Sequence, residues 1–254
     1  MRLIDTHCHF DHPVFDVDRS ALVRSMNAKG ISDVIFPAVT AASWQRLRDI
    51  TQTSVHFHAS YGLHPMFMAE HQEKNIAQLR HWLEHEQPVA VGECGLDFFI
   101  ENPDKARQIT LFTQHIRLAR EFDLPLIIHA RKSLDEVLKQ IRRAGSLRGV
   151  IHSFSGSQQQ ADQLIEQGFY LGVGGTVTYD RAQRLHKVIA NIPQERILLE
   201  TDAPDQPDSH WRGKRNEPAR LVVIAETVAK LTDTSTENIA NITTANTQRL
   251  FGIT

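Results

Sequence analysis

Eight short apolar runs, separated by amphipathic stretches with helical spacing, are the feature that most restricts the fold of this chain. The runs are rich in Val, Ile and Leu and show little polar alternation, as in parallel strands buried on both faces. Eight such units in 254 residues match the usual size of a (β/α)8 barrel. We therefore predict an α/β fold with one barrel domain over residues 1–254. The expected strands are Leu3–Asp5, Asp33–Phe36, Val55–Tyr61, Val89–Glu93, Leu126–His129, Gly149–His152, Tyr170–Val173 and Arg196–Leu199.

Local signals mark the helices between these strands. Ser133 with Glu136, and Ser157 with Gln160, have the spacing of capping boxes at helix starts, and Gly168 is suited to a helix end. Other helices are expected to begin near Asp180 and Pro218 and to span Thr236–Leu250.

A doubly wound open sheet shares this alternation and is the alternative fold. It would predict a glycine-rich phosphate turn after the first strand, where this chain has Thr-His-Cys-His. Gly172, Gly174 and Gly175 do not have the G-x-G-x-x-G spacing. A dinucleotide-binding site is therefore not expected.

Composition excludes several classes of protein. With 28 Lys and Arg against 30 Asp and Glu, the formal charge is −2, so general basicity does not hold nucleic acid. No apolar run approaches the ~18 residues of a membrane span, and no signal-peptide stretch opens the sequence. Cys8 and Cys94 form no secreted disulfide framework. We expect a cytoplasmic protein with reduced cysteines, no membrane contact and no obligate protein partner.

Potential metal ligands stand at the carboxyl ends of five expected strands, where barrel active sites are built. His7 and His9 are two residues apart in extended chain, so both face one side while Cys8 faces the other. A histidine at one strand end is more often structural than a ligand, but structural histidines have no reason to gather at one end. The expected ligands are His7, His9, Glu93, His129, His152 and Asp202.

Four imidazoles and two carboxylates suit Zn²⁺, Mn²⁺ or a similar ion such as Mg²⁺ better than a thiolate-binding metal. Six ligands exceed the three of a typical catalytic zinc. The surplus predicts two divalent ions, and Glu93 is the natural bridge between them. The remaining histidines contrast with this set: His71, His81, His85, His115 and His186 are expected to be solvated on helices, while His56 and His58 have no settled place.

Six segments follow one another along the chain: Ile4-Asp5-Thr6-His7-Cys8-His9, Gly62-Leu63-His64-Pro65, Val91-Gly92-Glu93-Cys94-Gly95-Leu96-Asp97, Pro125-Leu126-Ile127-Ile128-His129-Ala130-Arg131, His152-Ser153-Phe154-Ser155-Gly156 and Leu199-Glu200-Thr201-Asp202-Ala203-Pro204. In this order they resemble the motifs of the TatD-type metal-dependent deoxyribonucleases, which belong with the amidohydrolase-like barrels. The resemblance extends from residue 4 to beyond Pro218. It implies a (β/α)8 fold, a divalent-metal centre with the six ligands above, and a substrate or phosphate contact by His64. Cys94 and Ala130 depart from the usual residues without touching a ligand position.

Several neighbours of these motifs have two readings. Arg131 either reaches a substrate phosphate or forms a salt bridge at the rim. Glu200 either supports a metal-binding histidine or belongs to a buried ion pair. The basic loop Arg212–Arg215, with the glycine-rich Gly172–Thr176, is placed where barrels often bind phosphate. For Phe98–Phe99, core packing is favoured over stacking on a base.

The resemblance implies a phosphodiester hydrolase acting on DNA ends, a DNase of the 3′-exonuclease type, or on another small phosphodiester. We expect catalytic roles for Asp202, Glu93, His64 and Arg131, with Asp202 as both ligand and proton acceptor. The alternative is an amidohydrolase of a small amide, lactone or deaminable ring. Its carbamate-bridged subclass is disfavoured because no lysine lies between Lys74 and Lys105. An inactive binding scaffold is a third reading, which the complete ligand set disfavours.

Overall fold

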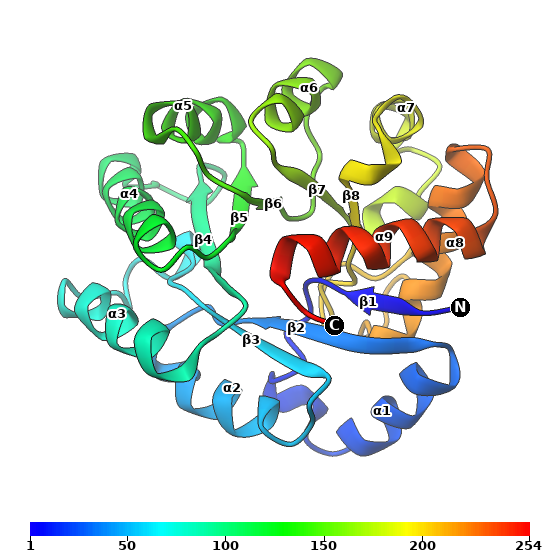
Figure 1. Ribbon diagram of the computed structural model, residues 1–254, viewed down its shortest axis with the longest axis horizontal. Helices are drawn as coiled ribbons and strands as arrows, with labels where there is room; N and C mark the ends of the chain where they lie inside the picture. Colours follow the sequence, from blue (N-terminus) through cyan, green and yellow to red (C-terminus); the bar gives the residue numbers. More distant parts are fainter.

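The computed structural model describes all 254 residues and confirms the (β/α)8 barrel (Figure 1). Eight parallel strands form one sheet in the order β1 to β8. Hydrogen bonds from Thr6 N to Leu199 O, at 3.0 Å, and from Asp202 N to His7 O, at 2.8 Å, join the two edges just beyond β1 and β8. The strands are β1 Leu3–Asp5, β2 Ile31–Pro37, β3 Phe57–Tyr61, β4 Ala90–Asp97, β5 Leu126–Arg131, β6 Gly149–Ile151, β7 Tyr170–Val173 and β8 Ile197–Leu199.

Helices surround the sheet and bury its outer face. They are α1 Arg19–Ala28, α2 Trp44–Thr51, α3 Lys74–Glu86, α4 Lys105–Glu121, α5 Leu134–Ala144, α6 Gln158–Glu166, α7 Gln183–Asn191, α8 Leu221–Leu231 and α9 Thr236–Phe251. None of them combines the length and apolar composition required to cross a membrane.

The C-terminal segment closes the amino end of the barrel. Helix α9 lies beside β1 and β8, where Asn246 Nδ2 donates to Ile197 O at 2.9 Å and Thr244 Oγ1 donates to Arg2 O at 3.0 Å (Figure 1). Leu250, Phe251 and Ile253 join strand side chains in a separate apolar cluster. The opposite end, where the strands terminate, is left for polar side chains.

Several local expectations are wrong. Strand β3 begins at Phe57 and not at Val55, and β5 continues past His129 to Arg131. Glu93 lies within β4 and does not end it, because the strand continues to Asp97. Ser133 makes no capping hydrogen bond to α5; its hydroxyl instead donates to Leu96 O at 2.7 Å. By contrast, the capping box of Ser157 and Gln160 is confirmed at the start of α6.

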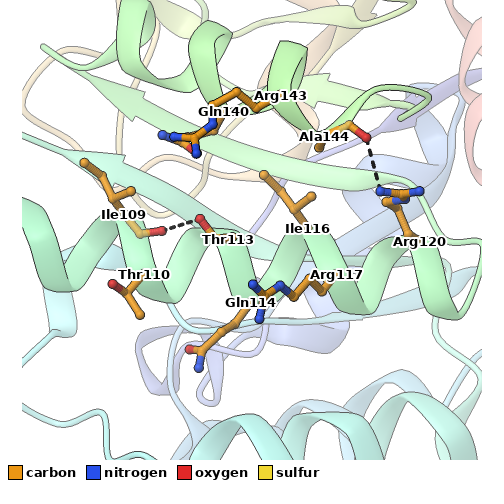
Figure 2. Close-up of a pocket in the computed structure, with 10 residues that line it drawn as sticks. All are labelled: Ile109, Thr110, Thr113, Gln114, Ile116, Arg117, Arg120, Gln140, Arg143 and Ala144. Carbon is orange, nitrogen blue, oxygen red and sulfur yellow. Dashed lines mark hydrogen bonds between the residues drawn. The ribbon is translucent and has the colours of Figure 1, made fainter.

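A groove of about 460 Å³ lies between α4 and α5 on the outer surface of the barrel (Figure 2). Arg117, Arg120 and Arg143 line it together with Gln and Thr side chains. Arg120 Nη1 donates to Ala144 O at 3.2 Å. The groove shares no residue with the cavity at the carboxyl ends of the strands.

Candidate metal centre

The carboxylate of Glu93 is the point on which the expected ligands converge. This residue is 1% exposed in the middle of β4, and its carboxylate lies among imidazoles from four other strand ends. The Oε2 atom lies 3.2 Å from His7 Nε2 and 3.6 Å from His9 Nε2. The Oε1 atom lies 3.2 Å from His129 Nδ1 and 3.1 Å from His152 Nε2. Each oxygen of the carboxylate therefore faces two of the expected ligands, and Oε1 also faces His64.

Asp202 completes the side that holds His7 and His9. Its Oδ1 atom lies 3.5 Å from His7 Nε2 and 3.4 Å from His9 Nε2. Gln206 Nε2 donates a hydrogen bond to the other oxygen, Oδ2. The structure thus brings all six expected ligands into one cluster.

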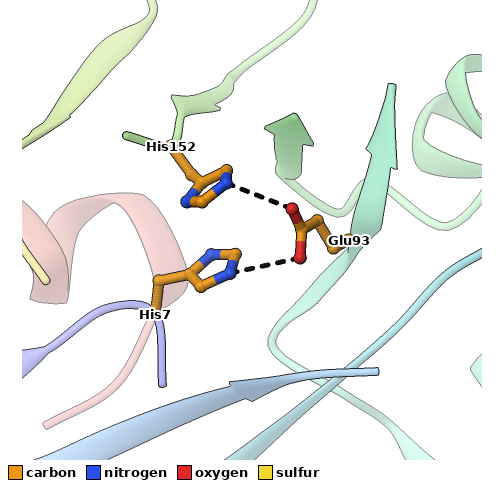
Figure 3. A group of neighbouring side chains, drawn as sticks. All are labelled: His7, Glu93 and His152. Atoms are coloured by element: carbon orange, nitrogen blue, oxygen red, sulfur yellow. Dashed lines mark ion pairs between the residues drawn. The ribbon is translucent and has the colours of Figure 1, made fainter. Parts of the chain in front are cut away.

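Several atoms of the cluster are buried without a hydrogen-bond partner. Figure 3 shows His7 and His152 directed at the Glu93 carboxylate. These close contacts lack hydrogen-bond geometry, so His7 Nε2 and Glu93 Oε2 are both unsatisfied. Leaving such groups buried and unpaired costs about 1–3 kcal/mol each. A cation held among them would supply the missing partner, so the residues fit a metal.

Hydrogen bonds on the outer side of two rings fix which nitrogen faces the cluster. His9 Nδ1 lies 3.2 Å from Pro37 O, and His129 Nε2 lies 3.1 Å from Asp97 Oδ2. Because both partners only accept, each of these nitrogens must carry the hydrogen. The opposite nitrogen then offers its lone pair to the cluster, as metal-binding histidines do.

His152 lies against Glu200 without a hydrogen bond between them. The His152 Nδ1 atom is 3.4 Å from Glu200 Oε1, and that oxygen accepts from Ser153 N at 2.5 Å. Glycine is required at position 172 because a Cβ there would overlap the Glu200 carboxylate. Glu200 therefore contacts a candidate ligand, as the supporting role requires, and its one ion-pair contact is with that same histidine.

His64 lies in the same cluster, but its ring directs an N–H group, and not a lone pair, at Glu93. Its Nδ1 accepts from Met66 N at 3.0 Å, so the neutral ring carries its hydrogen on Nε2. That Nε2 lies 3.0 Å from Glu93 Oε1. Burial lowers the pKa of His64, which favours the neutral ring. His64 therefore presents an N–H donor to the centre, which suits an anionic oxygen better than a metal ion.

Electrostatics keep both acids of the cluster ionised. Burial alone would raise their pKa values, but the surrounding imidazoles outweigh it. Positive charge on the nearby histidine rings holds the pKa of Glu93 well below its usual range and lowers the pKa of Asp202 to about 2. Both side chains are therefore carboxylates at neutral pH.

A cavity of about 890 Å³ opens above the cluster, and Arg131 lines it. Its guanidinium has no carboxylate partner and lies 3.9 Å from the centre of the Phe99 ring. Phe99 is 56% exposed, whereas Phe98 packs against the core. The salt-bridge reading of Arg131 is therefore wrong, and core packing holds only for Phe98.

The basic loop after β8 does not reach this cavity. Arg215 forms an ion pair with Asp18 at 2.6 Å, and Lys214 lies 4.1 Å from the centre of the Trp211 ring. No residue of Arg212–Arg215 lines the cavity. The expectation that this loop binds phosphate beside the centre therefore stays a prediction, which the lining of the cavity does not support.

Two histidines expected to be solvated are buried beside His64. His115 Nε2 accepts from Leu63 N at 3.1 Å, and His71 Nε2 donates to His64 O at 2.8 Å. Position 115 was expected on a helix, which α4 confirms, but the sequence gave no sign that this histidine is fully buried. Of the others, His81 and His85 are exposed, His186 is half-buried, and His56 and His58 both contact Asp33.

The sequence argument missed two carboxylates. Asp97, four residues after Glu93, orients His129. Asp11, two residues after His9, borders the cavity. Both continue a strand-like alternation from an expected ligand, and this spacing is the signal that could have identified them.

Comparison with known proteins gives the same assignment over almost the whole chain. The family model described as TatD related DNase matches residues 4–252. A relative from Escherichia coli K12, the uncharacterized metal-dependent hydrolase YjjV, is 38% identical and is aligned over 99% of this chain and 98% of its own. The metal-dependent hydrolase YabD of Bacillus subtilis is 33% identical, with 99% of each chain covered.

Solved structures agree with these matches. The crystal structure of Escherichia coli YjjV, described as a TatD homologue, superposes with a TM-score of 0.96 at 36% identity, covering 100% of this chain and 99% of the other. A TatD-family hydrolase from Entamoeba histolytica shares the fold, with a TM-score of 0.88 at 20% identity, covering 100% of this chain and 99% of the other. The chain belongs to the TatD family of metal-dependent hydrolases.

Proposed function

We propose that this protein is a divalent-metal-dependent phosphodiesterase that removes nucleotides from DNA ends, a DNase of the 3′-exonuclease type. The observation that carries the proposal is the Glu93 carboxylate, buried with imidazole nitrogens of His7 and His9 beside one oxygen and of His129 and His152 beside the other. The family description supplies the substrate class. Residues 1–254 act as one hydrolase domain.

The donor set divides into two sites that share Glu93. Judged by the contacts with Glu93, His7, His9 and Asp202 would form one site with Glu93 Oε2, and His129 and His152 would form the other with Glu93 Oε1. We assign one divalent ion to each, with Zn²⁺, Mn²⁺ and Mg²⁺ as candidates. Such a pair supplies Lewis-acid polarisation of the phosphoryl oxygens and lowers the pKa of a water molecule.

The remaining steps fall to side chains around the donors. The His64 Nε2–H and the Arg131 guanidinium bind phosphoryl oxygens and stabilise negative charge as it develops there. Asp202 accepts the proton of the attacking water at Oδ2, which Gln206 holds in position. Glu93 stays ionised and orders both halves of the centre.

The shape and charge of the cavity favour an end over a duplex interior. Arg131 and Arg46 are the basic side chains that line it, and Arg46 is paired with Asp16. With few cations available, nonspecific binding along a helix is weak. The centre also lies at the bottom of the cavity, where a single strand enters more readily than a duplex. The free buried cysteines suit a reducing cytoplasm.

The test compares a linear single-stranded DNA with a covalently closed circle of the same sequence. We expect shortening of the linear strand from its 3′ end with Zn²⁺, Mn²⁺ or Mg²⁺, no reaction in EDTA, and a resistant circle. Glu93→Gln should lose most of this activity. Equal cleavage of circle and linear strand would refute action at ends. Hydrolysis of a dihydro-ring amide without any phosphodiester cleavage would favour the amidohydrolase alternative.

A further inference from the structure

The cavity above the metal centre has walls of opposite charge. Asp11 borders it beyond β1 and Arg131 at the end of β5. In a ring of eight strands in sequential order, β1 and β5 are four positions apart and therefore lie on opposite sides (Figure 1). A substrate bound across the centre meets a carboxylate on one side and a guanidinium on the other.

The acidic wall has unused hydrogen-bond acceptors. Asp11 is only 9% exposed, yet its carboxylate forms no ion pair and accepts no hydrogen bond from another residue. The nearby Arg46 donates instead to the backbone oxygen of Asp11, at 2.8 Å, and pairs its guanidinium with Asp16. Neither oxygen is among the fully buried atoms that lack a partner, so the carboxylate is open to the cavity that Asp11 lines. A carboxylate with no donor from the protein can accept one from a ligand.

The surroundings of Asp11 indicate which kind of donor fits. Thr40 and Ser43 from the β2–α2 segment line the same part of the cavity and carry neutral hydroxyls. No unpaired cation borders that side, so a phosphate would meet a carboxylate without compensation. A hydroxyl donates to a carboxylate, whereas a phosphate is repelled by it.

We propose that Asp11 is the specificity-determining residue that receives the free 3′-hydroxyl of the terminal nucleotide and rejects a 3′-phosphate. Arg131 on the opposite wall binds the phosphoryl group that is cleaved, and the rest of the strand leaves the cavity on that side. This inference rests on the proposed function. It adds which chemical group the 3′ end of the substrate carries, namely a free hydroxyl.

The test uses two oligonucleotides of one sequence and equal charge, one with a 3′-hydroxyl and a 5′-phosphate, the other with a 3′-phosphate and a 5′-hydroxyl. Cleavage with metal gives kcat/KM, and fluorescence anisotropy in EDTA gives the affinity without turnover. We expect the wild type to prefer the 3′-hydroxyl strand by about tenfold or more in both measurements, as for the loss of a hydrogen bond to a charged group.

Asp11→Asn should bring this ratio towards one, chiefly by improving the 3′-phosphate strand. Asp11→Ser is the second variant should Asn disturb folding. Asp205→Asn is the matched control because Asp205 lines the same cavity but is exposed, so the same charge is removed from solvent. This control should keep the wild-type ratio. Arg131→Gln should weaken both strands equally and leave the ratio unchanged.

Equal use of both strands by the wild type would overturn the proposal, as would equal shifts of the ratio in Asp11→Asn and Asp205→Asn. Bis(p-nitrophenyl) phosphate, which has no terminal hydroxyl, separates this failure from failure of the proposed function. If it is hydrolysed while both strands are cut alike, only the assignment of Asp11 fails. If neither it nor any strand is cleaved, the phosphodiesterase proposal fails.

Discussion

His115 should make the protein less stable in mild acid. The ring is fully buried on α4; its Nε2 accepts from Leu63 N and its Nδ1 donates to Leu111 O at 2.8 Å, an arrangement that only the neutral tautomer can form. Burial lowers the pKa of His115 from 6.5 to about 4. Between these two values the unfolded chain binds a proton that the folded chain does not, so stability falls as the pH falls.

The size of the effect follows from the two pKa values. Each unit is worth about 1.4 kcal/mol, and integration from pH 7 to 4.5 gives a loss of about 2.4 kcal/mol from this one group. The assay is urea unfolding in EDTA, followed by tryptophan fluorescence at several pH values. His115→Gln should be less stable than the wild type at pH 7, but the difference should shrink by about 2 kcal/mol at pH 4.5.

His85→Gln is the matched control because His85 is an exposed histidine on α3. The free energy of unfolding of His85→Gln should depend on pH in the same way as that of the wild type, since His115 is present in both proteins. Parallel curves for wild type and His115→Gln would refute the reasoning, because they would mean that His115 titrates alike in the folded and unfolded chains.

Three further outcomes are expected. Asp97→Asn should weaken metal binding by about 10- to 100-fold in a chelator competition, because Asp97 orients His129; an unchanged affinity would contradict this. Cys8→Ser should keep its full metal content in elemental analysis, since Cys8 Sγ faces Ala203 O at 3.7 Å; metal loss from the folded variant would show that Cys8 reaches the centre. Single-stranded DNA binding in EDTA should lose affinity with a log–log salt slope of about −1, because Arg131 is the unpaired cation of the cavity; a slope near −8 would reveal a basic surface elsewhere.

The parts of the fold that depend on local pattern were predictable. Buried parallel strands give continuous apolar runs, and so the bounds of β1 and β7 were predicted residue by residue. The positions of the ligands followed from the predicted strands, because the carboxyl ends of all parallel strands lie on one side of the barrel. Alternation along an extended chain also separated Cys8 from His7 and His9.

Contacts between distant segments were not predictable from these patterns. Arg215 pairs with Asp18 across the loops that follow β8 and β1, and no local period encodes that partner. His115 is a similar case. Its position was expected on a helix, but nothing in the local pattern indicated that its ring would accept a hydrogen bond from the Leu63 amide. The tautomer of His64 likewise depends on the Met66 amide in the short helix that follows.

The most direct test of the account is the metal content of wild type, Glu93→Gln and His64→Gln, measured by elemental analysis after equilibrium dialysis against Zn²⁺ or Mn²⁺. We predict two ions per wild-type chain, the loss of at least one in Glu93→Gln, and two in His64→Gln, because His64 presents an N–H to the centre. A wild-type chain that binds no ion, or a folded His64→Gln that loses as much metal as Glu93→Gln, would contradict the assignment of the centre.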